Sequence, residues 1–447
     1  MTDDLAQLTQ RLLDAARKAG AEAADAMAVS GSSLAIDLRA GRLETAERSE
    51  ATEVGLRVLM GRRQACVSAS DLSERTFAAL AERAVAMALE APEDATAGLA
   101  DPGQLAQGWD VAALDLCDPA AEPSPDALEA DCHALEVAAL SRSGIRQVEA
   151  SAGYSRSAMH LAASNGFSGG YQRSSRSLSA VAFAGEGTAM ERDWAGEGRV
   201  YQSDLPAADQ IGALAAERAL GRLGAVKPVT GRYPVLFDER IAASLVGHLL
   251  GAVNGAAIAR GASWLRDALG QQVLPKGISV IEDPHRPRLS SSRPFDGEGL
   301  ATQRRALVED GILTGWTLDL ATARKLGLTS TANASRGTSA PPSPATTNID
   351  LTPGAHSRAD LIRDMGTGLL VTSMIGSTIN PTTGDYSRGA SGFWVEGGEI
   401  RHPVHECTIA GNLREMLMRL IPANDARAHL STRVPSCLID GMILAGS

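Results

Sequence analysis

The first half of the chain carries the same order of sequence patterns twice: a helical stretch, then strands, then a second helix. Residues 4–19 place leucine and alanine at the spacing of an amphipathic helix, and residues 34–58 then alternate apolar and polar side chains, as strands do. A second helical pattern covers about 73–91. The two periods, 3.6 and 2, exclude each other within one element. Their alternation along the chain therefore predicts an α+β architecture.

The second copy opens with a clear helix start. The side chain of Ser124 can accept a hydrogen bond from a free N–H group of the first turn, and Pro125 occupies a position where proline is favoured. The apolar stripe that follows includes Cys132 and ends at Gly144. This pattern predicts a helix whose cysteine packs in the core.

Strands follow this helix, and together the two copies complete one domain. Residues 145–200 alternate as strands, the Asn165-Gly166 pair favours a hairpin turn in which two positive φ values are tolerated, and a helix is expected over about 207–223. Residues 92–124 are rich in Ala, Asp, Pro and Gly, and we interpret them as a connector between the copies. The prediction is one N-terminal α+β domain, residues 1–227.

The composition changes at Lys227-Pro228 toward Gly, Thr and Pro with short strand-like runs. A C-terminal domain, residues 228–447 and rich in antiparallel β-structure, is therefore expected, opening with a helix over about 238–252. Residues 396–399 read as a tight hairpin turn. The four prolines of residues 329–354 predict a long surface loop without regular structure.

Charge and composition exclude several classes of protein. The 447 residues contain 42 basic and 53 acidic side chains, a net charge of −11, which argues against direct binding to nucleic acid. No apolar run approaches the roughly 20 residues of a membrane helix, and the start, Met1 to Asp4, is acidic where a signal peptide would be basic. The five cysteines are widely spaced and form no CxxC pair, as is typical of reduced thiols. A cytoplasmic location is expected.

Motifs for hydrolysis are incomplete in this chain. The only His-Glu pair is His405-Glu406, and neither HExxH nor HExxxH occurs. His402 lies close in sequence, but in a strand it would face away from His405, which leaves His405 and Cys407 side by side as an open alternative for a metal site. Ser168 stands in a literal GxSxG, but the residues after it alternate as a strand, so a hairpin residue is expected and not a nucleophile.

One segment has an unusual composition for a strand. Residues 387–392 are almost all Ser, Gly and Ala, and such strands often mark the close approach of another backbone. Two interpretations stay open: an extended peptide adds to this strand, or the strand packs tightly beneath a helix. Similarly, His248 on the apolar face of the 238–252 helix is either a buried core histidine or a group that faces a ligand cavity.

Several long motifs resemble those of the TldD/PmbA family, in particular its PmbA (TldE) branch. They lie densely in residues 235–447, whereas the first half of the chain matches by layout alone. The motifs are Pro294–Gly299, Asp310–Thr314, Ala323–Gly327, Thr383–Glu396, Thr408–Leu413, Asn424-Asp425 and Asp440–Gly446.

The resemblance implies a function and also a departure from it. Members of this family are cytoplasmic, were once described as modulators of DNA gyrase, and form a zinc metallopeptidase from one TldD and one TldE subunit that acts on unfolded or leader-type peptides. In the TldD branch an HExxxH helix and a cysteine from a Cys-Gly-Lys loop hold the metal. Here the corresponding helix segment, residues 244–252, contains His248 but lacks the Glu and the second His of that motif. Residues 424–435 contain no Cys-Gly-Lys loop. The resemblance thus implies a non-catalytic subunit without catalytic or metal-ligating residues, with zinc expected in a TldD-type partner.

The expected contact residues follow from the small-residue segment. Asp385, Tyr386, Ser387 and Arg388 are predicted to contact peptide or partner, with His248 as a further candidate. An alternative function is a stand-alone protein-binding modulator, a homodimer without peptidase activity.

Overall fold

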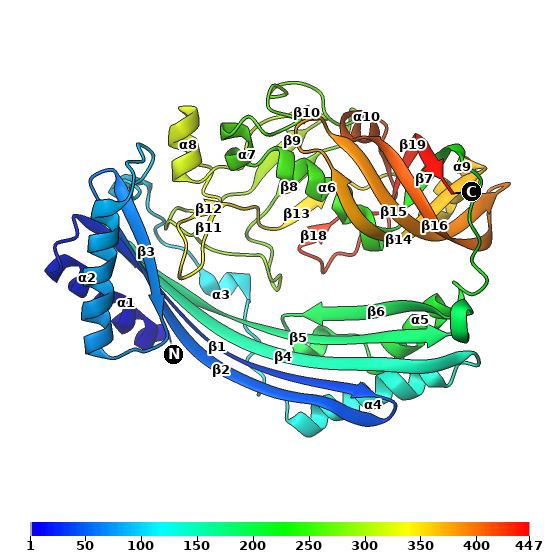
Figure 1. Ribbon diagram of the computed structural model, residues 1–447, viewed down its shortest axis with the longest axis horizontal. Coiled ribbons are helices and arrows are strands. Elements are labelled where there is room, and N and C mark those ends of the chain that lie inside the picture. The colour runs from blue at the N-terminus through cyan, green and yellow to red at the C-terminus, as the bar shows by residue number, and fades with distance from the viewer. Residues whose placement is uncertain (1, 447) are drawn as a thin grey trace.

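The computed structural model describes residues 2–446 and confirms a mixed α+β architecture (Figure 1). The N-terminal half forms one antiparallel six-stranded sheet in the order β3-β2-β1-β4-β5-β6, to which both copies of the repeated pattern contribute. Its strands are β1 (Ala23–Arg39), β2 (Arg42–Met60), β3 (Arg63–Ala69), β4 (Ile145–Ala163), β5 (Ser168–Ala184) and β6 (Glu191–Arg199).

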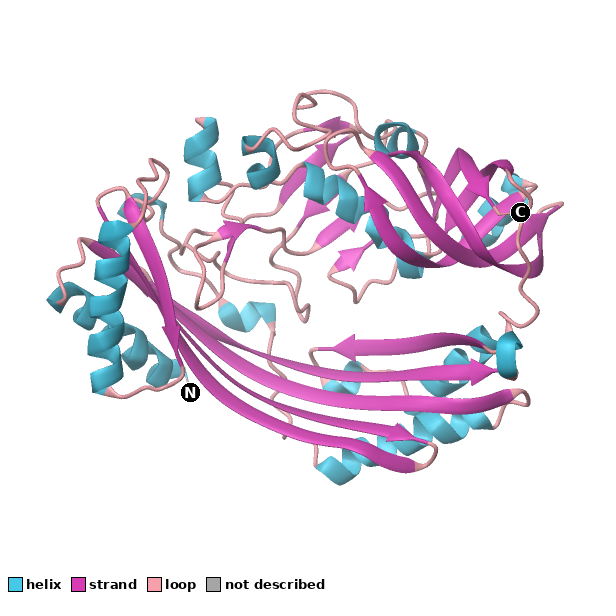
Figure 2. Cartoon of the chain, viewed as in Figure 1, coloured by secondary structure: helices cyan, strands magenta, loops and turns pink. Residues whose placement is uncertain are grey.

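The long strands of this sheet curve, and four helices cover the convex face while the C-terminal half lies over the concave face (Figure 2). The helices are α1 (Thr2–Lys18), α2 (Glu74–Glu90), α4 (Pro125–Leu140) and α5 (Ala208–Leu220). The strand periodicity decides this arrangement, because Leu34, Ile36 and Leu38 are all buried against α4 and its neighbours.

Small residues bring α4 and α5 close together. A Cβ atom on Gly212 of α5 would stand 2.1 Å from the carbonyl oxygen of Leu135 in α4, so no larger residue fits there without movement. The start of α4 is as expected: the Ser124 side chain accepts from the Ala127 N–H at 3.2 Å, and Cys132 is fully buried. The Asn165-Gly166 hairpin is also present, but only Gly166 has a positive φ, of 100°.

The C-terminal half contains a second six-stranded sheet, in the order β16-β15-β14-β7-β19-β17, that closes on itself through pairing of β16 with β19. The predicted hairpin turn is present, with φ values of 62° at Gly397 and 76° at Gly398. The strands are β7 (Gly231–Phe237), β14 (Gly368–Ile379), β15 (Asp385–Glu396), β16 (Glu399–Asn412), β17 (Ile421–Pro422) and β19 (Cys437–Ala445). The helices of this half are α6 (Glu239–Ala252), α7 (Gly255–Ala259), α8 (Leu320–Leu326), α9 (Arg358–Met365) and α10 (Leu413–Met418).

The prediction of a long surface loop over residues 329–354 is only partly right, because most of the segment is irregular but it is not confined to the surface. The segment forms β11 (Ala334–Ser335), β12 (Ser343–Pro344) and β13 (Ile349–Leu351), and its Asn348 side chain is completely buried. Strand β13 pairs with β8 (Val280–Glu282) and β18 (Thr432–Arg433). The same small sheet continues from β8 into β9 (Arg305–Glu309) and β10 (Ile312–Leu313).

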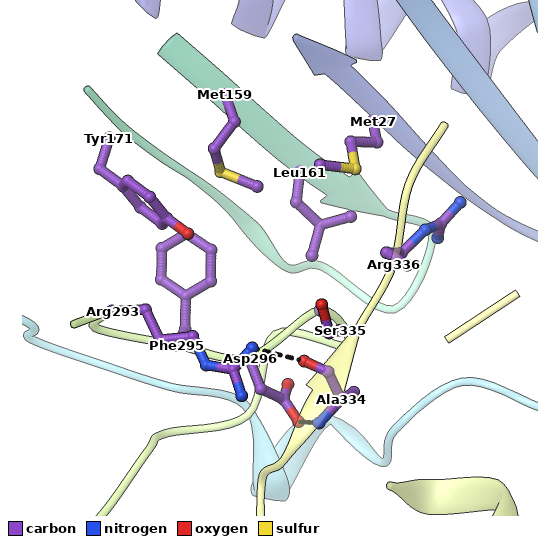
Figure 3. Close-up of a pocket in the computed structure, with 11 residues that line it drawn as sticks. Met27, Met159, Leu161, Tyr171, Arg293, Phe295, Asp296, Ala334, Ser335 and Arg336 are labelled. Atoms are coloured by element: carbon purple, nitrogen blue, oxygen red, sulfur yellow. Dashed lines mark hydrogen bonds between the residues drawn. The ribbon is translucent and has the colours of Figure 1, made fainter. Parts of the chain in front are cut away.

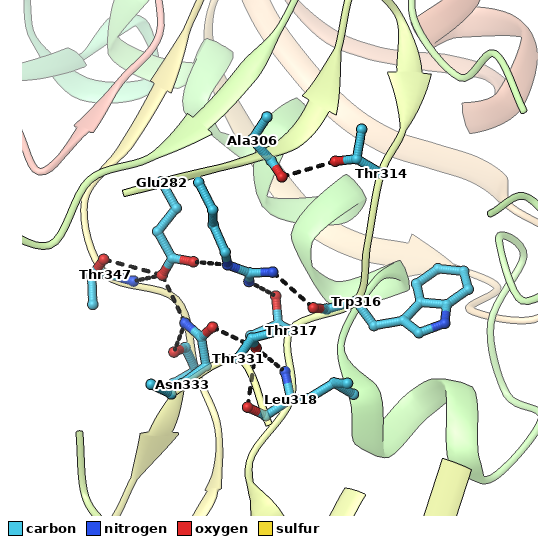
Figure 4. A network of polar contacts seen from close by, with 12 residues as sticks. Glu282, Ala306, Thr314, Trp316, Thr317, Leu318, Thr331, Asn333 and Thr347 are labelled. Carbon is cyan, nitrogen blue, oxygen red and sulfur yellow. Dashed lines mark hydrogen bonds and ion pairs between the residues drawn. The ribbon is translucent and has the colours of Figure 1, made fainter. Parts of the chain in front are cut away.

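A buried carboxylate makes this proline-rich path possible (Figure 4). One oxygen of Glu282 accepts from the Thr347 N–H at 2.7 Å and from the Asn333 amide at 2.8 Å, and the other pairs with Arg305 at 2.9 Å. The polar groups of an irregular segment are thus satisfied by a residue about fifty positions away in the chain. Sequence periodicity carries no signal for such a contact.

The connector over residues 92–124 does more than join the two copies. It contains α3 (Val111–Leu114) and runs along the C-terminal half, where the Ala106 N–H donates to the Gly299 carbonyl at 2.9 Å. The Arg324 guanidinium of α8 donates to the carbonyls of Thr96 and Leu99. Across residues 2–446, helices long and apolar enough to cross a bilayer are absent.

Candidate functional site

The structure brings three of the five predicted contact residues together beside α6. The His248 ring meets the Tyr386 ring edge to face, with centroids 5.8 Å apart. Burial, and then the charge of Arg388, hold the pKa of His248 below its ordinary value. The Nε2 atom of His248 is buried without a hydrogen-bond partner among the described residues. The lowered pKa favours the neutral imidazole, which contacts the Tyr386 ring and feels the charge of Arg388.

Tyr386 and Arg388 are held from the strand side. Tyr386 is only 2% exposed and donates its hydroxyl to the sulfur of Met374 at 3.4 Å. Burial raises the pKa of this hydroxyl to about 12, so it stays protonated at neutral pH. The Arg388 Nε donates to the Gly376 carbonyl at 2.8 Å.

Asp385 and Ser387 lie on the opposite face of β15, because neighbouring strand residues alternate between faces. Asp385 is exposed, and its carboxylate accepts from Thr383 and Asn412, which lowers its pKa. It borders a cavity of about 310 Å³ that also includes Arg232. The five predicted residues thus form two separate groups.

The interpretation of β15 as a strand open to an added peptide is wrong. Strand β15 is hydrogen-bonded to β14 on one side and to β16 on the other. Its glycines serve the close approach of β14, since a Cβ on Gly392 would stand 1.9 Å from the Leu370 carbonyl oxygen. The close-approaching backbone expected from the small residues is the neighbouring strand.

His405 and Cys407 do not share a site. The backbone at Glu406 has a φ of 48°, which breaks the strand alternation between them. The His405 Nδ1 lies 3.3 Å from a carboxylate oxygen of Glu191 in β6. The Cys407 thiol instead donates to the Ala390 carbonyl inside the core, and burial raises its pKa to about 11.

A cavity that the sequence did not reveal separates β5 and β6 from β14 and β15. Its volume is about 700 Å³, and its walls include three large apolar side chains that remain well exposed: Met190 at 54%, Trp194 at 53% and Ile375 at 78%. Arg222 also lines this cavity. Its Nη1 lies 3.6 Å from a carboxylate oxygen of Asp193, and its Nη2 donates to the Ser391 hydroxyl at 2.8 Å. The available signal was Trp194 itself, a large aromatic side chain in a strand made mostly of charged residues and glycines.

At the other end of the same interface the two halves are in tight contact (Figure 3). The Phe295 ring lies 4.9 Å from Phe167, 5.1 Å from Trp109 and 5.5 Å from Tyr171, measured between centroids. The cavity that remains there holds only about 70 Å³.

Three charged side chains are buried beside this aromatic contact. Asp25 of β1 pairs with Arg57 of β2 at 2.5 Å and with Arg336 from the C-terminal half. Burial raises the pKa of Asp25, but the two guanidinium groups outweigh it and lower the pKa below its ordinary value.

Comparison with known proteins finds matches to one family along most of the chain. Family models described as the PmbA/TldA metallopeptidase domain 1, central domain and C-terminal domain match residues 24–88, 118–223 and 230–446. The chain belongs to the PmbA/TldD family. It is 37% identical over 416 residues to the metalloprotease PmbA of Escherichia coli O157:H7, covering 92% of this chain and 90% of the relative. A PmbA homologue of Haemophilus influenzae is 35% identical and covers 99% and 96%.

Two solved structures have the same fold. A candidate modulator of DNA gyrase from Bacteroides thetaiotaomicron superimposes with a TM-score of 0.93 at 28% identity, covering all of both chains. TldE from Thermococcus kodakarensis gives a TM-score of 0.86 at 19% identity over 98% of this chain and 99% of that one, a likeness of fold alone.

The metallopeptidase description raises the question of whether this PmbA/TldD-family chain can hold a metal at α6. A catalytic zinc needs three protein ligands of the His, Cys, Asp or Glu type. The buried Nε2 of His248 is one donor, but its neighbours are the Tyr386 ring and the Arg388 cation, which would repel a metal ion. Nowhere in residues 2–446 are three such side chains grouped for metal binding. The residues at α6 do not fit a zinc site.

Proposed function

We propose that this chain is a TldE-type, non-catalytic subunit of a cytoplasmic TldD/TldE-type metallopeptidase that acts on unfolded or leader peptides. In this proposal the zinc belongs to a TldD-type partner, and no residue of this chain touches the metal. The observation that carries it is the surroundings of His248: one imidazole, one aromatic ring and one guanidinium, in a chain of a metallopeptidase family.

The concave side of the molecule supports a role in holding peptide. An unfolded peptide differs from a folded protein by its exposed apolar side chains, and the 700 Å³ cavity offers Met190, Trp194 and Ile375 to such groups. Of the predicted contact residues, the exposed Asp385 has the surface to meet a partner, whereas the buried Tyr386 acts through its packing on His248.

The experiment measures zinc content and peptide hydrolysis for this chain alone, for a TldD-type chain alone and for their mixture. We expect zinc to follow the TldD-type chain, and hydrolysis of an unfolded peptide to require the mixture. Stoichiometric zinc on this chain together with hydrolysis by it alone would overturn the proposal.

A variant of this chain sharpens the test. His248→Asn, assayed in the mixture, should leave the zinc content unchanged, because the imidazole is not a ligand; loss of zinc would contradict the proposal. If the two chains never associate and this chain is instead a stable homodimer, the stand-alone modulator is favoured.

A further inference from the structure

A second cavity, of about 250 Å³, lies at the free edge of β6, which is the last strand of its sheet. Trp194 and Glu197 of β6 and Leu214 and Arg218 of α5 form one side of it. The C-terminal half supplies the other side with two more arginines, Arg240 at the start of α6 and Arg427 in the loop before β18. None of these residues belongs to the group around His248.

Two of the three arginines already have carboxylate partners. Arg240 lies 3.0 Å from Asp238 and 3.4 Å from Asp193. Arg427 lies 2.7 Å from Glu239 and 3.3 Å from Glu197. These carboxylates neutralise the guanidinium groups of Arg240 and Arg427, so neither arginine is expected to bind a further anion.

Arg218 differs from them. Its Nη1 donates to the Trp194 carbonyl at 3.0 Å, and no carboxylate in residues 2–446 comes within the 4 Å of an ion pair. Burial, and then the charge of Arg240, lower its pKa, while the carboxylates of Asp193, Asp238 and Glu239 raise it only from beyond ion-pair distance. The cavity therefore contains one partly buried cation that lacks a direct counterion.

Apart from Gln210, the remaining wall of the cavity is apolar. Trp194 is 53% exposed and Leu214 is 39% exposed, and the buried Ile211 of α5 and Pro206 just before this helix also line the cavity. Exposed apolar groups beside a guanidinium without a direct ion-pair partner suit a ligand that is itself apolar at one end and anionic at the other. The volume lies below the roughly 300–1,000 Å³ of sites for drug-sized ligands, so the ligand is about one residue in size.

We propose that this cavity binds a free carboxylate attached to an apolar side chain. The carboxylate pairs with Arg218 through the N–H groups that the Trp194 carbonyl does not occupy, and the apolar group packs on Trp194 and Leu214. A peptide C-terminus and a free apolar amino acid derivative share this chemistry. The peptide source alone rests on the proposed function.

Isothermal titration calorimetry of the full chain tests the site with a matched pair of probes, N-acetyl-leucine and N-acetyl-leucinamide. The two differ only in the negative charge. We expect one molecule of N-acetyl-leucine to bind per chain, and the amide to bind at least about tenfold more weakly, because it cannot form the charge-assisted hydrogen bonds. Equal binding of both probes, or no binding of either, would overturn the proposal.

Two substitutions place the binding in this cavity. Arg218→Gln should weaken N-acetyl-leucine by about tenfold or more, whereas Arg75→Gln, at an exposed position of α2 far from the cavity, should bind as the wild type does. Because Arg218 also holds the Trp194 carbonyl, Leu214→Asp provides an independent test: its carboxylate occupies Arg218 from a half-exposed helix position and should abolish binding. Wild-type affinity in both Arg218→Gln and Leu214→Asp would show that the cavity is not the site.

A third titration separates the two sources of the carboxylate. A short unstructured peptide that ends in leucine with a free C-terminus should compete with N-acetyl-leucine if peptides are the ligands, and its C-terminally amidated form should not. If only the single-residue probe binds, the same carboxylate chemistry serves a free small molecule. These measurements need no partner chain and no hydrolysis, so failure of the proposed peptidase role would leave their result unchanged.

Discussion

The two halves of the molecule meet at two places that differ in nearly every physical respect. At the closed end, defined by Asp25, Arg57, Arg336 and Phe295, charges are paired out of water and aromatic rings are in contact. At the open end, defined by Met190, Trp194 and Ile375, apolar side chains stay exposed around a cavity of about 700 Å³.

The difference indicates that the closed end stabilises the fold and that the open end is suited to binding another molecule. The closed end satisfies its buried groups within the chain, so substitutions there should change stability. The open end leaves apolar side chains exposed, so substitutions there should change stability little. These side chains offer a contact surface to another molecule. Four substitutions test this contrast, from the largest expected effect to the smallest.

Asp25→Ala should have the largest effect. It removes the shared partner of two guanidinium groups whose side chains are almost fully buried, and an uncompensated buried charge costs about 3–5 kcal/mol. Urea unfolding followed by circular dichroism measures the loss. The matched control is Asp267→Ala, an exposed partner of Arg266, which should cost less than about 1 kcal/mol. Equal effects of the two substitutions would contradict the contrast.

Glu298→Gln should change the pH dependence of stability. Glu298 is buried next to Asp296 and accepts from the Leu320 N–H; burial, and then the Asp296 charge, raise its pKa to about 8. The folded state therefore holds a proton that the unfolded state releases near 4.5, so the wild type loses stability as pH rises from about 4.5 to about 8.

The glutamine has no proton to lose and keeps the acceptor for Leu320. Its free energy of unfolding should fall less across that interval, with a difference from wild type of the order of 2 kcal/mol at the upper end. Unfolding titrations of both proteins across the interval measure this. Parallel pH profiles would mean that Glu298 is already ionised in the folded protein.

Phe295→Leu should cost about 1–2 kcal/mol. Leucine keeps much of the buried apolar volume but loses the ring contacts with Trp109, Phe167 and Tyr171. Thermal unfolding measures the change. Trp194→Leu is the matched aromatic substitution at the open end and should have the smaller effect, since Trp194 is half exposed. The reverse order would refute the assignment of the closed end as the structural contact.

Ile375→Ser should leave stability within about 0.5 kcal/mol, because the side chain is 78% exposed. Under the proposed function the same substitution should weaken binding of an unfolded apolar peptide, measured by fluorescence anisotropy of a labelled peptide. A large loss of stability would show that Ile375 is packed and that the open end also stabilises the fold.

Local patterns predicted the regular parts of the molecule well. The helix beginning at Ser124, the buried Cys132 and the hairpin turn at Gly397-Gly398 all follow from the spacing of apolar residues and from the few residues that accept capping or positive φ. The pairing of β15 could not be predicted this way. A row of small residues indicates that some backbone comes close, but it does not say whether that backbone is a peptide or the neighbouring β14.

The contact residues show the same limit. Sequence proximity suggested that Asp385, Tyr386, Ser387 and Arg388 act together, yet strand alternation divides them between two faces. Arg218 and Arg222 of the cavities gave no local signal, because an arginine near the end of an amphipathic helix is ordinary.

The sequence by itself determined the α+β class, the order of helices and strands, and the lack of an HExxxH helix, since each of these depends on residues only a few positions apart. Only the tertiary structure decided that Asn333 and Thr347 bind the buried Glu282, that Asp25 meets Arg336, and that Arg218 has no ion-pair partner within 4 Å among the described residues. The first two of these features join residues about fifty to more than three hundred positions apart, and burial makes each unpaired polar group costly. Their partners are therefore fixed by the packing of the whole fold and not by any local pattern.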